Sequence, residues 1–238
     1  MRLAALRQKN WLILHDVDSL SDDASPHQPG PALFDGDAWR RQARVLGEAP
    51  GRGQSLFVQA GPHQWVLRPY RRGGLVARVC QARYLWLGAE RTRAFRELRL
   101  TAALFEQGLP VPRPIAAGVK RVGVAYEAAL ITVRIESAQA LASRLSEGSV
   151  CDALLERVGA MVARFHQAGL DHVDLNARNV LIDNDDRPWL IDFDRCRLRA
   201  PGPWRADNLA RLARSVAKFS AAPEAVMQAI STGYDSAS

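Results

Sequence analysis

Two short polar motifs in the C-terminal part of the chain constrain its fold and chemistry more than any other feature. The first spans residues 172–179 and reads His-x-Asp-x-x-x-x-Asn, and the second spans residues 192–194 and reads Asp-Phe-Asp. Between them, apolar runs at residues 180–182 and 189–191 flank a polar turn at residues 184–186. This pattern predicts a β-hairpin that joins the two motifs.

An amphipathic pattern precedes the first motif. Residues 152–168 carry apolar side chains at helical spacing, and Gly169 follows as a C-terminal stop signal. The first motif is therefore expected on a loop between a helix and a hairpin, and the hairpin should return Asp192 to the neighbourhood of Asn179.

The side chains of the two motifs have the chemistry that phosphoryl transfer from ATP requires. A kinase uses one carboxylate to orient the attacking hydroxyl, and an Asn and a second Asp to hold magnesium on the phosphates. In that order, Asp174 is the candidate catalytic residue, and Asn179 and Asp192 are the candidate Mg²⁺ ligands. An ordinary polar turn, or a helix cap at Asp174, explains single residues but not the joint order.

The histidine of the first motif is expected to be structural. His172 could form a zinc pair with His166, but the two are six residues apart and no cysteine accompanies them. Support of the loop is the favoured interpretation of His172.

The N-terminal half carries weaker signals of the same kind. Gly51-Arg52-Gly53 separates two strand-like stretches and could let backbone amides approach a phosphate, although a plain hairpin turn is the commoner explanation of Gly-x-Gly. Arg68 stands where kinases usually carry a phosphate-binding lysine. Glu97, on a predicted helix, is its expected ion-pair partner in the ATP site, with a surface charge as the alternative.

Positive charge is concentrated in one segment. The chain has 32 Lys and Arg against 25 Asp and Glu, and residues 65–100 contain nine Arg and two Glu, which equals the whole excess of +7. Arginine suits bidentate contacts to phosphate and carboxylate. The segment therefore favours an anionic ligand such as nucleic acid, an anionic membrane or a phosphorylated substrate, with a solvated basic face as the alternative. The long interval between Arg68 and Glu97 also predicts an additional basic helix near residues 75–87.

These features predict an α+β, protein-kinase-like two-lobed fold with a mainly β N-lobe and a reduced helical C-lobe. Residues 1–35 contain loop-forming sequences and are expected to be a loosely ordered lead-in. Residues 36–135 are the expected N-lobe and residues 136–238 the expected C-lobe of a single kinase-like domain. Neither a signal peptide nor a membrane span is expected.

Over most of residues 40–220, the chain resembles the lipopolysaccharide kinase family. The segments that discriminate best are residues 70–74, Tyr-Arg-Arg-Gly-Gly, and residues 192–195, Asp-Phe-Asp-Arg. Two departures stand out: Val173 replaces the usual Ala, and Pro69 replaces an expected His.

The resemblance implies ATP- and Mg²⁺-dependent phosphorylation of the 4-hydroxyl of 3-deoxy-D-manno-octulosonic acid (Kdo) on a Kdo-lipid A precursor, with Asp174 as the catalytic carboxylate. It also implies a peripheral location at the cytoplasmic face of a Gram-negative inner membrane, with the anionic membrane surface as a partner. Neither nucleic acid nor an obligate protein partner is expected.

Three other functions remain as alternatives. A soluble small-molecule kinase of the aminoglycoside or choline kinase type would typically need an acidic substrate pocket, whereas this chain is basic. A protein kinase would need an activation segment and peptide-binding helices, and only 46 residues follow Asp192. A non-catalytic nucleic-acid-binding module would leave the set of Asp174, Asn179 and Asp192 unexplained.

Overall fold

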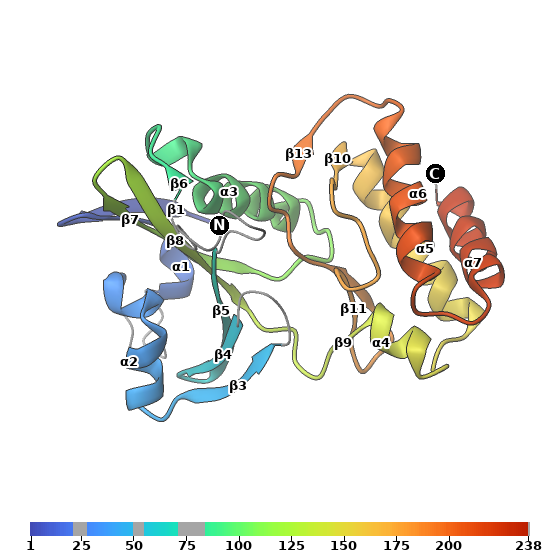
Figure 1. The fold of residues 1–238 in the computed structure, drawn as a ribbon, viewed down its shortest axis with the longest axis horizontal. Helices are drawn as coiled ribbons and strands as arrows, with labels where there is room; N and C mark the ends of the chain where they lie inside the picture. Colours follow the sequence, from blue (N-terminus) through green and yellow to red (C-terminus); the bar gives the residue numbers. More distant parts are fainter. Residues whose placement is uncertain (21–27, 50–54, 71–83, 238) are drawn as a thin grey trace. The chain divides into compact units, whose positions relative to one another are not determined.

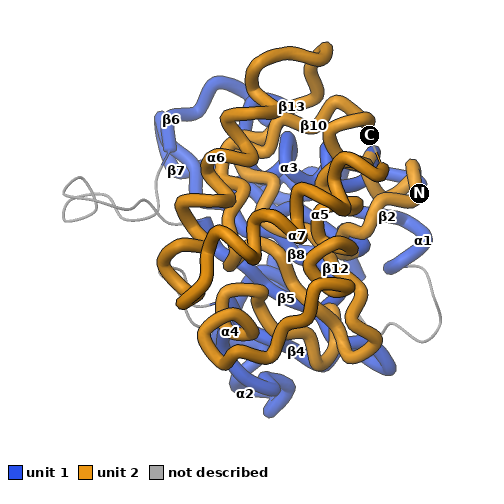
Figure 2. The backbone as a smooth tube through the Cα atoms, turned by 90° about the vertical axis from the view of Figure 1, so that its right-hand side faces the viewer, with its two compact units in different colours: residues 1–103, 113–134 blue, residues 104–112, 135–238 orange. Residues whose placement is uncertain are grey.

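The computed structural model describes residues 1–20, 28–49, 55–70 and 84–237. The chain forms two compact units, shown in different colours in Figure 2. The N-terminal unit comprises residues 1–103 and 113–134, and the C-terminal unit comprises residues 104–112 and 135–238.

The N-terminal unit is built on an eight-stranded antiparallel sheet (Figure 1). The strand order is β1-β2-β7-β8-β5-β4-β3, and β6 pairs with β8. The strands are β1 (Leu3–Gln8), β2 (Trp11–Asp16), β3 (Val45–Ala49), β4 (Ser55–Ala60), β5 (His63–Pro69), β6 (Tyr84–Leu85), β7 (Pro114–Val122) and β8 (Ala125–Val133).

Alternation of side chains along these strands gives the sheet two apolar faces. Leu67 of β5 and Ile131 of β8 pack in one cluster with Trp39 of the short helix α2 (Gly36–Arg41). Their neighbour Leu130 faces the other way and packs with Phe95 of α3 (Arg93–Glu106). Because successive strand residues point to opposite faces, α2 and α3 cover opposite sides of the sheet (Figure 1). The helix α1 (Val17–Leu20) and the 3₁₀ helices η1 (Pro31–Phe34) and η3 (Ala89–Arg91) also lie in the described part of this unit.

The first strands differ from the predicted loose lead-in. β1 and β2 form a hairpin in which Gln8 lies opposite Trp11, with Lys9 in the left-handed region at φ 53°. β2 then pairs with β7, about a hundred residues later, and its Ile13 is fully buried. This long-range pairing orders the segment, and local composition does not reveal it.

The structure also bears on Pro69, which replaces an expected His on β5, and on the basic helix predicted near residues 75–87. β5 runs through Pro69, and the Tyr70 amide donates to Ala128 O over 2.9 Å. Among the described residues, the last β4–β5 pair on this side is Leu56 with Leu67, so Pro69 lies beyond the described end of β4. Of the predicted basic helix at residues 75–87, only 84–87 are described, and they begin with strand β6 instead.

The C-terminal unit is mainly helical. Its helices are α4 (Leu141–Ser146), α5 (Asp152–Gln167), α6 (Trp204–Val216) and α7 (Pro223–Ser236), and its short strands are β9 (Gln139–Ala140), β10 (Leu170–Asp171), β11 (Val180–Ile182), β12 (Pro188–Leu190) and β13 (Arg197–Leu198). α5 and α7 approach so closely that a Cβ on Gly159 would lie 1.9 Å from Ile230 O. A sheet-based unit and a helical unit confirm the predicted α+β class.

Candidate active site

The first motif lies on a tight loop between α5 and β11 in the C-terminal unit. α5 ends at Gln167, and Gly169 follows at φ 81°, as its position after the helix predicted. β10 then pairs with β13, and the chain enters the loop at His172. Asp174 is exposed on this loop, whereas its neighbour Leu175 is buried and anchors the loop to the core.

Two asparagines fix the loop around the backbone carbonyl of Asp174. Asn176 Nδ2 and Asn179 Nδ2 each donate to Asp174 O over 2.9 Å. Asn176 Oδ1 in turn accepts from the amides of Arg178 and Asn179, at 2.9 and 3.3 Å. The backbone carbonyl of Asp174, the candidate catalytic residue, therefore orients the side chain of Asn179.

The β11–β12 hairpin brings the second motif back to the first, as predicted. The Ile191 amide donates to Asn179 O over 3.0 Å, immediately before Asp192. Asp192 itself is half-buried and adopts φ 65°, a left-handed conformation that Asp tolerates better than most residues. Phe193 beside it is buried against the rings of Phe165 and His172.

His172 ties the two motifs together, in the structural role expected for it. Its Nε2 lies 3.1 Å from Ile191 O, and because a carbonyl can only accept, Nε2 carries the proton. Burial of the ring lowers the pKa of His172, partly opposed by this hydrogen bond to Ile191. The imidazole is therefore neutral at neutral pH and acts as a fixed brace instead of a charge.

Helix α6 supports the loop from behind, a contribution that the sequence motifs did not reveal. The Asn208 amide, in the orientation that satisfies its neighbours, donates to His172 O over 3.0 Å and accepts from the His172 amide over 3.1 Å. Ser215 Oγ, about two turns further along the same face of the helix, accepts from the Ala177 amide over 3.0 Å. Asn208 and Ser215 are polar residues on the buried face of an amphipathic helix. That pattern is the sequence signal that could have identified them.

In the N-terminal unit, the expected ion pair between Arg68 and Glu97 is present. Arg68 Nη2 donates to Glu97 Oε1, and Tyr70 Oη donates to Glu97 Oε2. Glu97 is buried on α3, whereas Arg68 on β5 is partly exposed. A buried carboxylate requires such partners, so Glu97 is a core residue of the unit and the alternative of a surface charge is wrong.

Tyr70 was not assigned a role from the sequence. It lies two residues after Arg68 and therefore on the same side of the extended chain. The Arg68 guanidinium lies over its ring, with Cζ 5.0 Å from the ring centroid. Tyr70 thus contacts both members of the ion pair.

The structure leaves one predicted element undescribed and adds a pocket elsewhere. Gly51, Arg52 and Gly53 lie outside the described residues.

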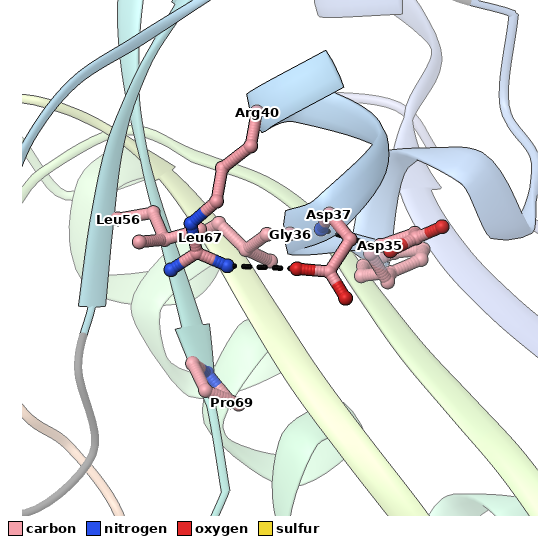
Figure 3. Close-up of a pocket in the computed structure, with 8 residues that line it drawn as sticks. Asp35, Gly36, Asp37, Arg40, Leu56, Leu67 and Pro69 are labelled. Carbon is pink, nitrogen blue, oxygen red and sulfur yellow. Dashed lines mark hydrogen bonds and ion pairs between the residues drawn. The ribbon is translucent and has the colours of Figure 1, made fainter.

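A pocket of about 270 Å³ lies on the side of β5 that faces away from the Arg68–Glu97 pair, over Leu67 and beside α2 (Figure 3). Its lining residues are Phe34, Asp35, Gly36, Asp37, Arg40, Leu56, Leu67 and Pro69.

Among the predicted site residues that the structure describes, none lines this pocket. Its polar edge is occupied by an ion pair in which Arg40 Nη1 lies 3.0 Å from Asp37 Oδ1 (Figure 3). Arg68 alternates with Leu67 along β5 and so faces away from the pocket. The pocket is therefore separate from the Arg68–Glu97 pair.

Comparison with known proteins agrees with these features. The model of the lipopolysaccharide kinase (Kdo/WaaP) family matches residues 36–234. A 3-deoxy-D-manno-octulosonic acid kinase of Vibrio parahaemolyticus is 41% identical over 212 residues, which are 89% of this chain and 87% of the relative. Proteins of the same name from Stenotrophomonas maltophilia and Xanthomonas campestris pv. campestris are each 48% identical, over 84% of this chain and 80% of the relative. The chain belongs to the lipopolysaccharide kinase (Kdo/WaaP) family.

Proposed function

We propose that this chain transfers the γ-phosphoryl group of ATP to the 4-hydroxyl of Kdo on a Kdo-lipid A precursor. The observation that carries the proposal is the hydrogen-bonded loop that holds Asp174, Asn179 and Asp192 together, in a chain whose relatives are named for Kdo phosphorylation. Membership of a kinase family supports ATP as the phosphoryl donor.

Asp174 is the proposed catalytic residue. Its carboxylate is exposed to an incoming acceptor while its backbone is fixed by two asparagine side chains. The acceptor oxygen forms a bond to the γ-phosphorus, the bond from that phosphorus to the β,γ-bridging oxygen breaks, and the hydroxyl proton passes to Asp174. The products are ADP and the phosphate monoester, and catalysis is mainly positioning and charge stabilisation.

Asn179 and Asp192 are the proposed magnesium ligands. Their amide and carboxylate oxygens suit a hard cation that prefers oxygen donors. Since Asn179 Nδ2 donates to Asp174 O, the amide orientation is fixed and Oδ1 is the atom that can act as a ligand. Bound magnesium would neutralise charge on the ATP phosphates.

Arg68 is the proposed phosphate-binding residue of the N-terminal unit, with Gly51, Arg52 and Gly53 as further candidates in the nucleotide site. Glu97 and Tyr70 hold the guanidinium from one side, which limits the orientations it can take. A preoriented guanidinium can contact phosphate oxygens in bidentate geometry, although not with the point-charge geometry of a lysine.

The lipid-linked acceptor would place the chain at the cytoplasmic face of a Gram-negative inner membrane. No helix in the described part of the chain is long and apolar enough to cross a membrane. The proposed attachment is peripheral, through the anionic surface of the bilayer where the acceptor lies.

Transfer of label from γ-labelled ATP to a panel of acceptors tests the proposal. The panel contains Kdo-lipid A precursor, the same lipid without Kdo, an aminoglycoside, choline and a generic peptide. We expect label on the Kdo-containing lipid alone. Label on an aminoglycoside, choline or the peptide in preference to the glycolipid would overturn the acceptor assignment.

A further inference from the structure

Three highly exposed apolar residues lie near one another along the backbone at one end of the N-terminal sheet. Leu85, Leu87 and Val124 are 62%, 60% and 79% exposed. β6 pairs with β8 so that Leu85 lies opposite Ala125, and the Trp86 amide donates to Val124 O over 2.9 Å. We call these three side chains the apolar tip. Single exposed apolar residues are ordinary, but a group of them marks an interaction surface.

The geometry of β6 explains why Leu85 points outward. Tyr84 and Trp86 both contact the ring of Tyr126, with centroids 5.4 and 6.2 Å apart. The alternation of the strand then turns Leu85 to the opposite, solvent-facing side. Leu87 follows the end of β6 and is also exposed. Polar residues normally occupy such solvent-facing positions. Because Leu85 and Leu87 are mostly exposed, they contribute little to the core of this unit.

Basic residues border the apolar tip. Lys120 and Arg121 lie near the C-terminal end of β7, and Arg121 Cζ lies 5.5 Å from the ring centroid of Trp86. The turn of the β1–β2 hairpin adds exposed Lys9, because its neighbour Asn10 exchanges hydrogen bonds with the Arg121 backbone at 2.8 and 3.2 Å. Two of the three lysines in the chain therefore lie here.

An acidic side chain also lies in this region. Glu127 lies opposite Lys120 in the β7–β8 ladder and offsets part of the charge. Figure 1 shows the ends of the β1–β2 and β7–β8 hairpins at the same end of the sheet as β6, which pairs with β8. The backbone therefore brings exposed apolar residues and basic residues together at this end of the sheet.

We propose that the apolar tip and its basic rim dock the chain on a bilayer of anionic lipid. The leucine and valine side chains would enter the headgroup region, and Lys9, Lys120 and Arg121 would contact lipid phosphates. The choice of a bilayer rests on the proposed function, since a lipid-linked acceptor lies in one. A second copy of the chain fits this surface less well, because a two-fold contact would bring the basic rims together.

Co-sedimentation of the full chain with vesicles tests the docking surface. One set of vesicles contains phosphatidylethanolamine with phosphatidylglycerol, and the other contains phosphatidylcholine alone. We expect binding to the anionic set only, weakened about tenfold or more in the triple variant Leu85→Ser, Leu87→Ser, Val124→Ser. The matched control is Leu46→Ser with Leu198→Ser, which removes leucines 49% and 47% exposed elsewhere and should leave binding unchanged.

Charge and fold are checked separately. Lys9→Gln with Lys120→Gln should weaken vesicle binding by about fivefold per residue, and added salt should weaken wild-type binding. Circular dichroism shows whether the triple variant is folded. If it is not, the double lysine variant tests the docking surface in its place. Equal binding by wild type and the tip variants, no binding to anionic vesicles, or tip-dependent self-association in place of binding would each overturn the docking surface.

Kinase activity on a water-soluble Kdo acceptor separates this inference from the proposed function. We expect the tip variants to keep wild-type turnover in that assay while they lose vesicle binding. Tip-dependent vesicle binding without any Kdo phosphorylation would refute the proposed function and leave the docking surface intact.

Discussion

At the residue scale, substitution of Asp174 should remove catalysis without disturbing the fold. Asp174→Asn keeps the shape of the side chain and the backbone carbonyl that Asn176 and Asn179 hold, but it cannot take up the hydroxyl proton. We expect kcat to fall by about 10²- to 10⁴-fold, the range for loss of a general base, with an unchanged melting temperature. Asp185→Asn in the exposed turn between β11 and β12 is the control and should retain full activity.

The hydroxyl of Tyr70 should matter to both stability and nucleotide binding. Tyr70→Phe leaves the buried Glu97 carboxylate with one donor fewer, which costs about 1–3 kcal/mol in the free energy of unfolding. A less restrained Arg68 should also raise the KM for ATP. Tyr84→Phe is the comparison variant, because it also removes one tyrosine hydroxyl, which accepts a hydrogen bond from Arg93 over 2.8 Å. A KM for ATP that rises equally in both variants would contradict the positioning role.

At the element scale, the contact between α5 and α7 depends on two glycines. A Cβ on Gly159 would lie 1.9 Å from Ile230 O, and one on Gly233 would lie 1.9 Å from Glu156 O. Gly159→Ala must push the helices apart, and we expect a loss of about 1–3 kcal/mol or more in denaturant unfolding. Gly47→Ala in β3, whose nearest new contact would be 3.7 Å, should lie close to wild type. Unchanged stability of Gly159→Ala would show that this packing is not tight in solution.

The elements that carry local signals were predictable from the sequence, and those fixed by distant partners were not. α5 and the β11–β12 hairpin follow from apolar periodicity and a polar turn, so the convergence of Asn179 and Asp192 was expected. β2 is ordered by β7, and the loop brace comes from Asn208 on α6. Hydrogen bonds between residues far apart in sequence leave no local pattern, which is why the lead-in and this brace escaped prediction.

At the scale of the whole molecule, a buried histidine should make stability depend on pH. Burial, with the nearby charge of Arg205, lowers the pKa of His166 from 6.5 to about 4, although Asp171 partly opposes this. Between these pH values the unfolded chain binds more protons than the folded one, so stability falls as pH drops from about 6.5 towards about 4. Thermal unfolding of wild type and His166→Asn over this range measures the effect.

The variant should show a flatter dependence than wild type. Some slope should persist, since the pKa of His172 is also lowered by burial and acts in the same direction. A wild-type melting temperature that is constant across this range, or an equal slope in both proteins, would show that His166 is not held neutral by the fold.

The most direct test of the central claim is the position of the transferred phosphate on the isolated product. Wild-type protein is incubated with ATP, Mg²⁺ and Kdo-lipid A precursor, and the product is analysed by mass spectrometry and phosphorus NMR. We predict one new phosphate monoester on the 4-hydroxyl of Kdo, absent from the Asp174→Asn reaction. A phosphate on the lipid A sugars or on protein, or the same product from the Asp174→Asn reaction, would contradict the account.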